Sequence, residues 1–208
     1  MKNNKNSKVR VRTKLELVER KKNFLKITDI LKKKKIIFFL QGGVLLGARR
    51  EKNFIKWDWD VEISLFSEDL IKNFEILVKE LRKCGYKIIN QNQTNYTPKI
   101  AFMKKNDKST FYSFIGWKYN SFNKSYTRRK FNIPEEFLRK FSKIKFLNKE
   151  FNCPSPIDGY LKHQYGNWKT PLISDNKVEY LNSHFYTSSN NIFYYINVIL
   201  TYLKKIFI

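Results

Sequence analysis

The sequence has few of the residues that build disulfide frameworks and zinc sites. Only two of its 208 residues are cysteine and only two are histidine. Cys84 and Cys153 form no CxxC pair and no Cys/His cluster, so neither a disulfide framework nor a zinc site is predicted. A reducing compartment is therefore the default expectation.

Long apolar runs are also lacking. No run reaches the roughly 18 residues of a spanning helix, and the basic N-terminus has no apolar core of about 7–15 residues, so neither a membrane span nor a secretory signal is predicted. The apolar segment 192–203, followed by Lys204 and Lys205, has two interpretations: a terminal helix packed on the domain, or an interfacial membrane anchor. We expect a cytoplasmic protein with peripheral contact at the inner face of a membrane.

Acidic residues are scarce, at 18 against 42 Lys and Arg, which gives a formal charge of +24. Such a surface attracts nucleotides, phosphorylated glycans, acidic lipid or nucleic acid. The lysines are spread evenly among many Asn, Ile and Phe residues, a mixture typical of AT-rich coding, so charge alone does not select a ligand. With 42% hydrophobic and 16% aromatic residues, the chain is expected to fold.

The hydrophobic patterns predict an α+β fold with a small mixed β-sheet flanked by helices. We expect a basic tail at 1–14, one domain at 15–185 and an apolar C-terminal helix at 186–208. Helices are predicted at 13–33, 44–51, 67–84, 134–141 and 157–164. Strands are predicted at 35–40, 57–65, 86–90, 98–104, 109–117 and 143–147, with a hairpin turn at 148–149.

The segment 40–63 carries the strongest chemical signal. In a strand over 57–65, period-2 alternation puts Asp58, Asp60 and Glu62 on one face, about 7 Å from one carboxylate to the next. Like charges in a row repel, and a bound cation is the obvious reason for them. About 15 residues earlier, Gly42 and Gly43 form a turn between a buried strand and a helix, an arrangement typical of phosphate binding.

These two features together resemble the LicD family, which includes bacterial phosphocholine transferases, fukutin and fukutin-related protein. The family motif is close to GGSLLGAVRxxxxIPWDxDVDI, and the matching residues here are Gly42, Gly43, Leu45, Leu46, Gly47, Ala48, Arg50, Ile55, Trp57, Asp58, Asp60, Val61 and Glu62. A second segment, 153–171, is similar to the family's closing segment through Tyr160, Leu161, Tyr165, Gly166, Trp168 and Pro171. The resemblance covers roughly residues 15–180.

The resemblance implies a nucleotidyltransferase-like fold and a metal-dependent phosphotransferase. Its expected reaction moves a phosphorylated alcohol, such as phosphocholine or ribitol or glycerol phosphate, from a CDP-linked donor to a glycan hydroxyl. The acceptor is a glycan or lipid-linked glycan of lipopolysaccharide or capsule biosynthesis, and no specific nucleic acid is expected.

The family also implies roles for single residues. Asp60 and Glu62 are expected to ligate Mg²⁺ (or Mn²⁺), with Asp58 as a further ligand or a supporting residue. The donor phosphates are expected at the turn and its helix, on Gly42, Gly43, Val44 and Arg50.

Three positions depart from the family pattern. Val44 stands where Ser or Thr is usual, and Glu62 replaces an Asp. The third acidic position of the site aligns with Thr110, and either Asp58 or Asp107 is expected to fill its role as a catalytic carboxylate. The departures keep an alternative open, a noncatalytic member that binds nucleotide or anionic glycan. An RNA-directed nucleotidyltransferase would rest on charge alone.

Other candidate residues have structural interpretations. His163 is expected to be an exposed or capping histidine, and Trp57 and Trp59 are expected in the core. The basic and aromatic stretch over 117–129 is compatible with a ligand surface or with a solvated hairpin.

Overall fold

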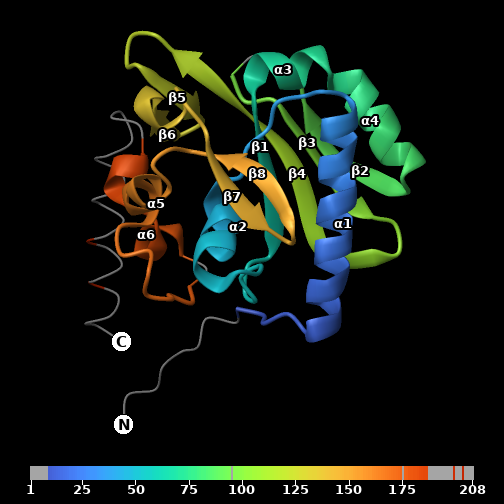
Figure 1. The fold of residues 1–208 in the computed structure, drawn as a ribbon, viewed down its shortest axis with the longest axis horizontal. Helices are drawn as coiled ribbons and strands as arrows, with labels where there is room; N and C mark the ends of the chain where they lie inside the picture. Colours follow the sequence, from blue (N-terminus) through green and yellow to red (C-terminus); the bar gives the residue numbers. More distant parts are fainter. Residues whose placement is uncertain (1–8, 95, 175, 187–198, 200–202, 204–208) are drawn as a thin grey trace.

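A six-stranded mixed sheet forms the centre of the protein, as the computed structural model shows for residues 9–94, 96–174, 176–186, 199 and 203 (Figure 1). The sheet order is β2-β3-β4-β5-β6, and β1 pairs with β4. A separate hairpin joins β7 to β8. The strands are β1 (Asp60–Phe66), β2 (Tyr86–Asn92), β3 (Lys99–Lys104), β4 (Asp107–Asn120), β5 (Ser125–Arg128), β6 (Phe131–Pro134), β7 (Ser142–Phe146) and β8 (Lys149–Cys153).

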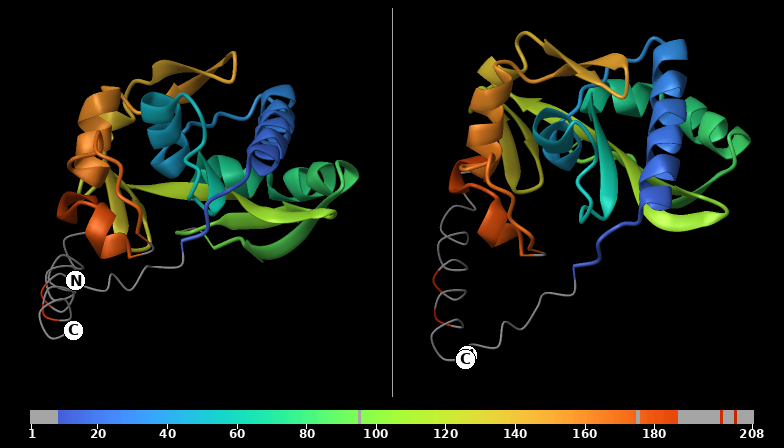
Figure 2. Two further views of the ribbon diagram at one scale, coloured as in Figure 1. Left: turned by 90° about the horizontal axis from the view of Figure 1, so that it is seen from below. Right: turned by 60° about the horizontal axis from the view of Figure 1, so that its bottom comes forward.

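Helices cover one side of the sheet, and a C-terminal segment lies at its far end (Figure 2). The α-helices are α1 (Lys14–Lys33), α2 (Gly42–Leu46), α3 (Ser67–Lys72), α4 (Phe74–Lys83), α5 (Ile157–Tyr165) and α6 (Lys177–Tyr180). A π-helical turn, η1 (Gly47–Glu51), continues α2. Two 3₁₀ turns, η2 (Glu135–Phe137) and η3 (Ser183–Phe185), complete the helical elements of the described residues.

The pairing of β1 with β4 is parallel, whereas the other strand pairs are antiparallel. Asp60 pairs with Phe111 and Glu62 with Ser113. Partners in register point to the same face of a sheet. The face that carries the two acidic residues therefore also carries the side chains at 111 and 113.

The opposite face of β1 is wholly apolar. Val61, Ile63 and Leu65 are fully buried there. On the same face of the neighbouring strands the Tyr86 hydroxyl donates a 2.9 Å hydrogen bond to Asn23 of α1. The alternation in β1 thus separates a core face packed under the helices from a polar face.

Helix α1 begins with a capping box. The Thr13 hydroxyl accepts from the Glu16 amide, and the Glu16 carboxylate accepts from the Thr13 amide at 2.8 Å. Both partners satisfy backbone donors that the first turn leaves free. The helix predicted over 13–33 is thereby confirmed.

The mixed sheet of the predicted α+β class is confirmed, and so are strands in the regions 86–90, 98–104, 109–117 and 143–147 and the helix over 157–164. Four expected elements differ. The run 35–40 makes only one bridge, Phe39 to Ser64. Asn73 divides the helix expected at 67–84 into α3 and α4, and the one expected at 134–141 is only the 3₁₀ turn η2. The strand expected from Trp57 begins at Asp60.

The ends of the chain test the predicted domain bounds only in part. Arg12 of the expected tail packs on the domain, because its side chain is buried and its amide donates to the Lys56 carbonyl at 2.8 Å. The expected helix at 186–208 lies almost wholly outside the described residues, as does the choice between packing and membrane contact. Among the described residues, no helix has the length and apolarity needed to cross a bilayer.

Candidate active site

A cleft of about 980 Å³ opens at the polar face of the sheet. Its lining combines the glycine turn, the acidic segment and the C-terminal segment, which are far apart in the sequence. The residues of the predicted site that line it are Gly42, Gly43, Val44, Arg50, Asp58, Asp60 and Glu62. Gln41, Trp57, Trp59, Tyr165 and Trp168 line it as well. The structure therefore brings the two expected halves of the site together.

Asp58 lies outside the strand, in the loop that leads into β1. A Cβ atom added to Gly43 would lie 2.0 Å from Asp58 Oδ2. The carboxylate is therefore pressed against the backbone of α2, where only glycine leaves it room. Burial raises the pKa of Asp58 to about 6, although the Arg20 guanidinium nearby acts in the opposite direction.

Asp60 and Glu62 are adjacent on the polar face of β1, and both are partly buried. Burial, together with the negative charges of Glu62 and Asp58, raises the pKa of Asp60 well above its ordinary value. This repulsion is what a bound cation would relieve. The structure thus keeps the acidic triplet in one place, although by a loop and a strand instead of a single strand.

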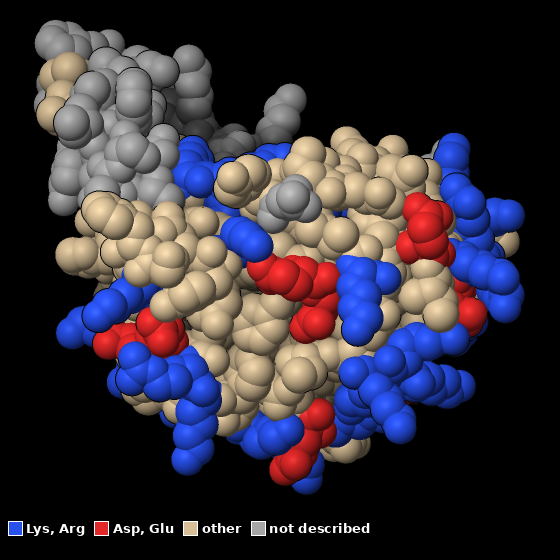
Figure 3. Space-filling model, turned by 90° about the horizontal axis from the view of Figure 1, so that it is seen from above, with Lys and Arg blue, Asp and Glu red and all other residues tan. Residues whose placement is uncertain are grey.

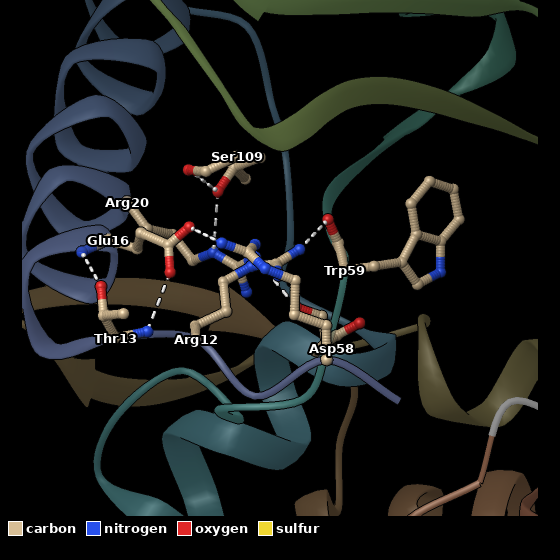
Figure 4. A network of polar contacts seen from close by, with 9 residues as sticks. Arg12, Thr13, Glu16, Arg20, Asp58, Trp59 and Ser109 are labelled. Carbon is tan, nitrogen blue, oxygen red and sulfur yellow. Dashed lines mark hydrogen bonds and ion pairs between the residues drawn. The ribbon is translucent and has the colours of Figure 1, made fainter. Parts of the chain in front are cut away.

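Two arginines that the motif did not indicate hold this segment. Arg12 Nη2 donates to the Trp59 carbonyl at 2.8 Å, and Arg20 Nη2 donates to the Asp58 carbonyl at 2.9 Å. Figure 4 shows both guanidinium groups reaching the 58–59 backbone from the N-terminal segment and α1. The sequence signal for Arg20 was its spacing, three residues after Leu17 and four before Phe24, which places it on the apolar face of α1. The many lysines of the same helix obscured this signal.

Arg20 also contacts Thr110, the residue that the family motif aligns with the third acidic position. Thr110 is fully buried, and its hydroxyl accepts from Arg20 Nε at 3.3 Å. It therefore faces the helices, on the side of β4 opposite the carboxylates. The residue of β4 that pairs with Glu62 is Ser113, so Thr110 does not lie beside the carboxylates.

Asp107 does not reach this part of β4. It begins the strand, four positions before Phe111, which pairs with Asp60. Its backbone is therefore about 13 Å along the strand from that level, at roughly 3.3 Å per residue. The expected substitution of Asp107 for the missing carboxylate is not supported by this placement.

Other predicted residues have structural partners. Arg50 donates to Glu51 at 2.8 Å and to the Trp168 carbonyl at 2.9 Å, so it ties η1 to the closing segment. Val44 is buried beneath the glycine turn. His163 contacts the Asn132 carbonyl at 3.3 Å, and burial lowers its pKa.

The two tryptophans differ from each other. Trp57 packs partly buried against the core, whereas 58% of the Trp59 side chain is exposed. Its ring contacts Phe111 edge to face, with centroids 5.8 Å apart. The expectation of a core role is wrong for Trp59, which stands at the cleft and points away from the arginine network (Figure 4).

A metal would have to be held by few protein ligands. Among the described residues, no group of three or more His, Cys, Asp or Glu side chains is arranged to hold a metal ion. Asp60 and Glu62 fit Mg²⁺ nevertheless, because Mg²⁺ is usually bound by one or two carboxylates with substrate phosphates and water completing its shell. Neither Asp60 nor Glu62 belongs to an ion pair of the described residues.

The structure combines a mixed sheet, an acidic strand, a glycine turn and one cleft. The comparison with known families gives the class of protein to which this arrangement belongs. Residues 35–156 match the model of the LicD/FKTN/FKRP nucleotidyltransferase domain. The match spans more than half of the chain, which therefore belongs to the LicD family. It ends at residue 156, so the likeness of most of 153–171 to the family's closing segment stays a prediction.

Two similar proteins from Rickettsia are uncharacterized. The protein of Rickettsia typhi is 27% identical over 145 residues, which are 67% of this chain and 43% of that protein. The protein of Rickettsia prowazekii is 28% identical over 148 residues, 67% of this chain and 51% of that protein. The chain thus spans about half the length of these relatives.

Two solved structures are similar at low identity. The lincosamide antibiotic adenylyltransferase LnuA, in its lincomycin-bound crystal structure, has a TM-score of 0.46 and 14% identity, over 70% of this chain and 82% of that one. The antibiotic-resistance factor ANT(2'')-Ia, in its solution structure, has a TM-score of 0.46 and 11% identity, over 67% of this chain and 66% of that one.

Proposed function

We propose that this protein transfers a phosphorylated alcohol from a CDP-linked donor to a glycan hydroxyl, with Mg²⁺ or Mn²⁺ as cofactor. The observation that carries the proposal is the position of Asp58, Asp60 and Glu62 beside the glycine turn, within one cleft. Membership of a nucleotidyltransferase-domain family supports a transferase. The donor head group, such as choline, ribitol or glycerol, is part of the proposal.

The transfer requires one bond to form and one to break. The acceptor oxygen attacks the phosphorus that bears the alcohol, the bond from that phosphorus to the bridging oxygen breaks, and CMP leaves. Asp58 takes the proton of the hydroxyl, since its carboxylate lies at the glycine turn in the cleft while Arg20 holds its backbone. Asp60 and Glu62 would hold the cation, which supplies charge neutralisation at the diphosphate.

The experiment is CMP release from CDP-choline, CDP-ribitol or CDP-glycerol in the presence of Mg²⁺ and a glycan acceptor. Asp60→Asn and Glu62→Gln are expected to lower the rate roughly a hundredfold or more. Glu150→Gln removes an exposed carboxylate of β8 and serves as the matched control. Equal rates for wild type and Asp60→Asn would refute the site.

Ser113 favours a second candidate, a noncatalytic member that binds nucleotide or anionic glycan. It occupies the position beside Glu62 where a further carboxylate would complete the acidic group. Calorimetric binding of CDP that does not depend on Mg²⁺, with no CMP release, would favour this candidate. Ser113→Asp is then expected to introduce Mg²⁺-dependent binding, and Ser113→Asn controls for side-chain size.

A further inference from the structure

Three basic side chains line the cleft across from the carboxylates. Lys99 comes from β3, Arg128 from the end of β5 and Lys177 from α6. None of the nine ion pairs among the described residues includes any of them. The chain has a charge of +24, with basic side chains spread over its surface (Figure 3). Four other basic residues also line the cleft, but Arg10 and Arg50 are in ion pairs, Arg12 donates to the Trp59 carbonyl, and Arg129 is exposed.

Lys99 is placed by strand register. It pairs with Ile115 of β4, and Ile115 pairs in turn with Ser64 of β1. Lys99 therefore lies on the same face of the sheet as Glu62. Burial lowers its pKa, Glu62 and Asp60 raise it, and Arg128 and Arg129 lower it. The ammonium thus lies between the carboxylates of β1 and two arginines, without an ion-pair contact to either carboxylate.

Arg128 is the strongest observation. Only 7% of it is exposed, it lines the cleft, and its guanidinium makes no ion pair and no hydrogen bond with another described residue. Its pairing strand places it on the polar face as well, because Thr127 pairs with Lys118 and the next pair would join Arg128 to Trp117. Burial lowers its pKa, and the largest opposing influence is Glu62.

A buried guanidinium with an unused donor is costly unless a ligand completes its hydrogen bonds. The planar fork of arginine suits two oxygens of one phosphate, and an ammonium adds a point charge beside it. A diphosphate bound here would face these cations on one side. On its other side it would face the carboxylates, with their bound cation.

We propose that Arg128 and Lys99, assisted by Lys177, form the binding site for the diphosphate of a nucleotide. The identification of that diphosphate as part of a CDP-linked donor rests on the proposed function. The geometry itself asks for an anion with more than one phosphate group. Arg128 and Lys99 are positioning residues, which hold the phosphates while the chemistry occurs at the carboxylates.

The test is calorimetric titration of the full chain with CDP, CMP and inorganic pyrophosphate in the presence of Mg²⁺. Arg128→Gln and Lys99→Gln are each expected to weaken CDP and pyrophosphate binding about tenfold to a hundredfold, the range for hydrogen bonds to charged groups. CMP binding is expected to weaken less. Arg82→Gln and Lys87→Gln remove exposed cations and are the matched controls.

Arg128→Lys separates a binding effect from a folding effect. It keeps the charge and the long side chain but loses the fork, so an intermediate affinity with an unchanged melting temperature is expected. Wild-type affinity for CDP in both Arg128→Gln and Lys99→Gln would overturn the inference, as would a wild-type protein that binds neither CDP nor pyrophosphate. Binding that depends on these residues, without CMP release from any CDP-linked donor, would support the inference while refuting the proposed function.

Discussion

Gly43→Ala is expected to disable the site through one steric conflict. The added Cβ atom would lie 2.0 Å from Asp58 Oδ2 and 3.1 Å from Asp58 Cγ, whereas ordinary contact begins at 3.4 Å. The carboxylate must then move by about 1.4 Å, the difference between 2.0 and 3.4 Å. The backbone of Asp58 cannot follow easily, since its carbonyl accepts from Arg20 at 2.9 Å and its amide donates to Ile55 at 3.2 Å.

The expected result is a large loss of turnover with a small change in stability. A misplacement of this size costs roughly a hundredfold in rate. Overpacking costs about 1–3 kcal/mol, but alanine in a helix is favoured over glycine by about 0.5–1 kcal/mol. Urea unfolding should therefore show a loss of at most about 2.5 kcal/mol. Gly159→Ala in α5 is the control, because its closest new contact is 3.2 Å from Pro156 Cγ.

A double-mutant cycle tests the reasoning without any assumption about the reaction. All three of the nearest atoms to the added Cβ belong to Asp58. In the Asp58→Ala background, Gly43→Ala should therefore become neutral or stabilise the fold by up to about 1 kcal/mol. An equal stability loss in both backgrounds would show that the conflict with Asp58 is not its cause.

Three further predictions concern stability and reactivity. Arg20→Met should lower the free energy of unfolding by about 2–3 kcal/mol in urea titrations, since it leaves buried acceptors unpaired, whereas Lys14→Met at an exposed position of α1 should change little; similar losses in both would refute the role given to Arg20. Thr13→Ala should cost about 1 kcal/mol. The Thr13 amide and Arg10 lower the pKa of Glu16 to about 2 from 4.5. The ionised Glu16 carboxylate therefore adds to the free energy of unfolding above pH 4.5, and this contribution is lost as the pH falls toward 2. A Glu16→Gln variant with the same acid unfolding curve would contradict this. Burial raises the pKa of the Cys153 thiol to about 12, so a disulfide reagent should modify it only after unfolding, and rapid modification of the native protein would be the contrary result.

The sequence was sufficient for the elements whose signals are local. The capping box at Thr13 and Glu16 marks where α1 begins. The alternation of Val61, Ile63 and Leu65 identifies the core face of β1. The motif of glycines and carboxylates indicated the two sides of the cleft, because its spacing is contained within one continuous segment.

The sequence was insufficient where strand register decides the outcome. Whether Thr110 or Ser113 lies beside the carboxylates depends on how β4 pairs with β1, about fifty residues earlier. A shift of an odd number of residues moves a side chain to the other face of the sheet. The alignment to Thr110 placed a core residue in the site, whereas the residue that pairs with Glu62 is Ser113.

Buried cations were the other feature that local patterns could not reveal. Arg20 looks like one more basic residue in a lysine-rich helix, and Arg128 like part of an exposed hairpin. Their environment is set by contacts with Asp58, Thr110 and the cleft, all distant in sequence. Only the folded structure separates these two from the many solvated lysines.

Because Ser113, which pairs with Glu62, is not acidic, Asp58 becomes the candidate proton acceptor of the proposed reaction. With only Asp60 and Glu62 on the strand, both directed to the expected cation, the proton acceptor of the proposed reaction must come from elsewhere. Asp58 is suited to this role because its carboxylate lies at the glycine turn in the cleft while its backbone is held by Arg20. The contacts of Asp58 with Gly43 and with Arg20 are therefore expected to limit activity more strongly than any departure within the motif itself.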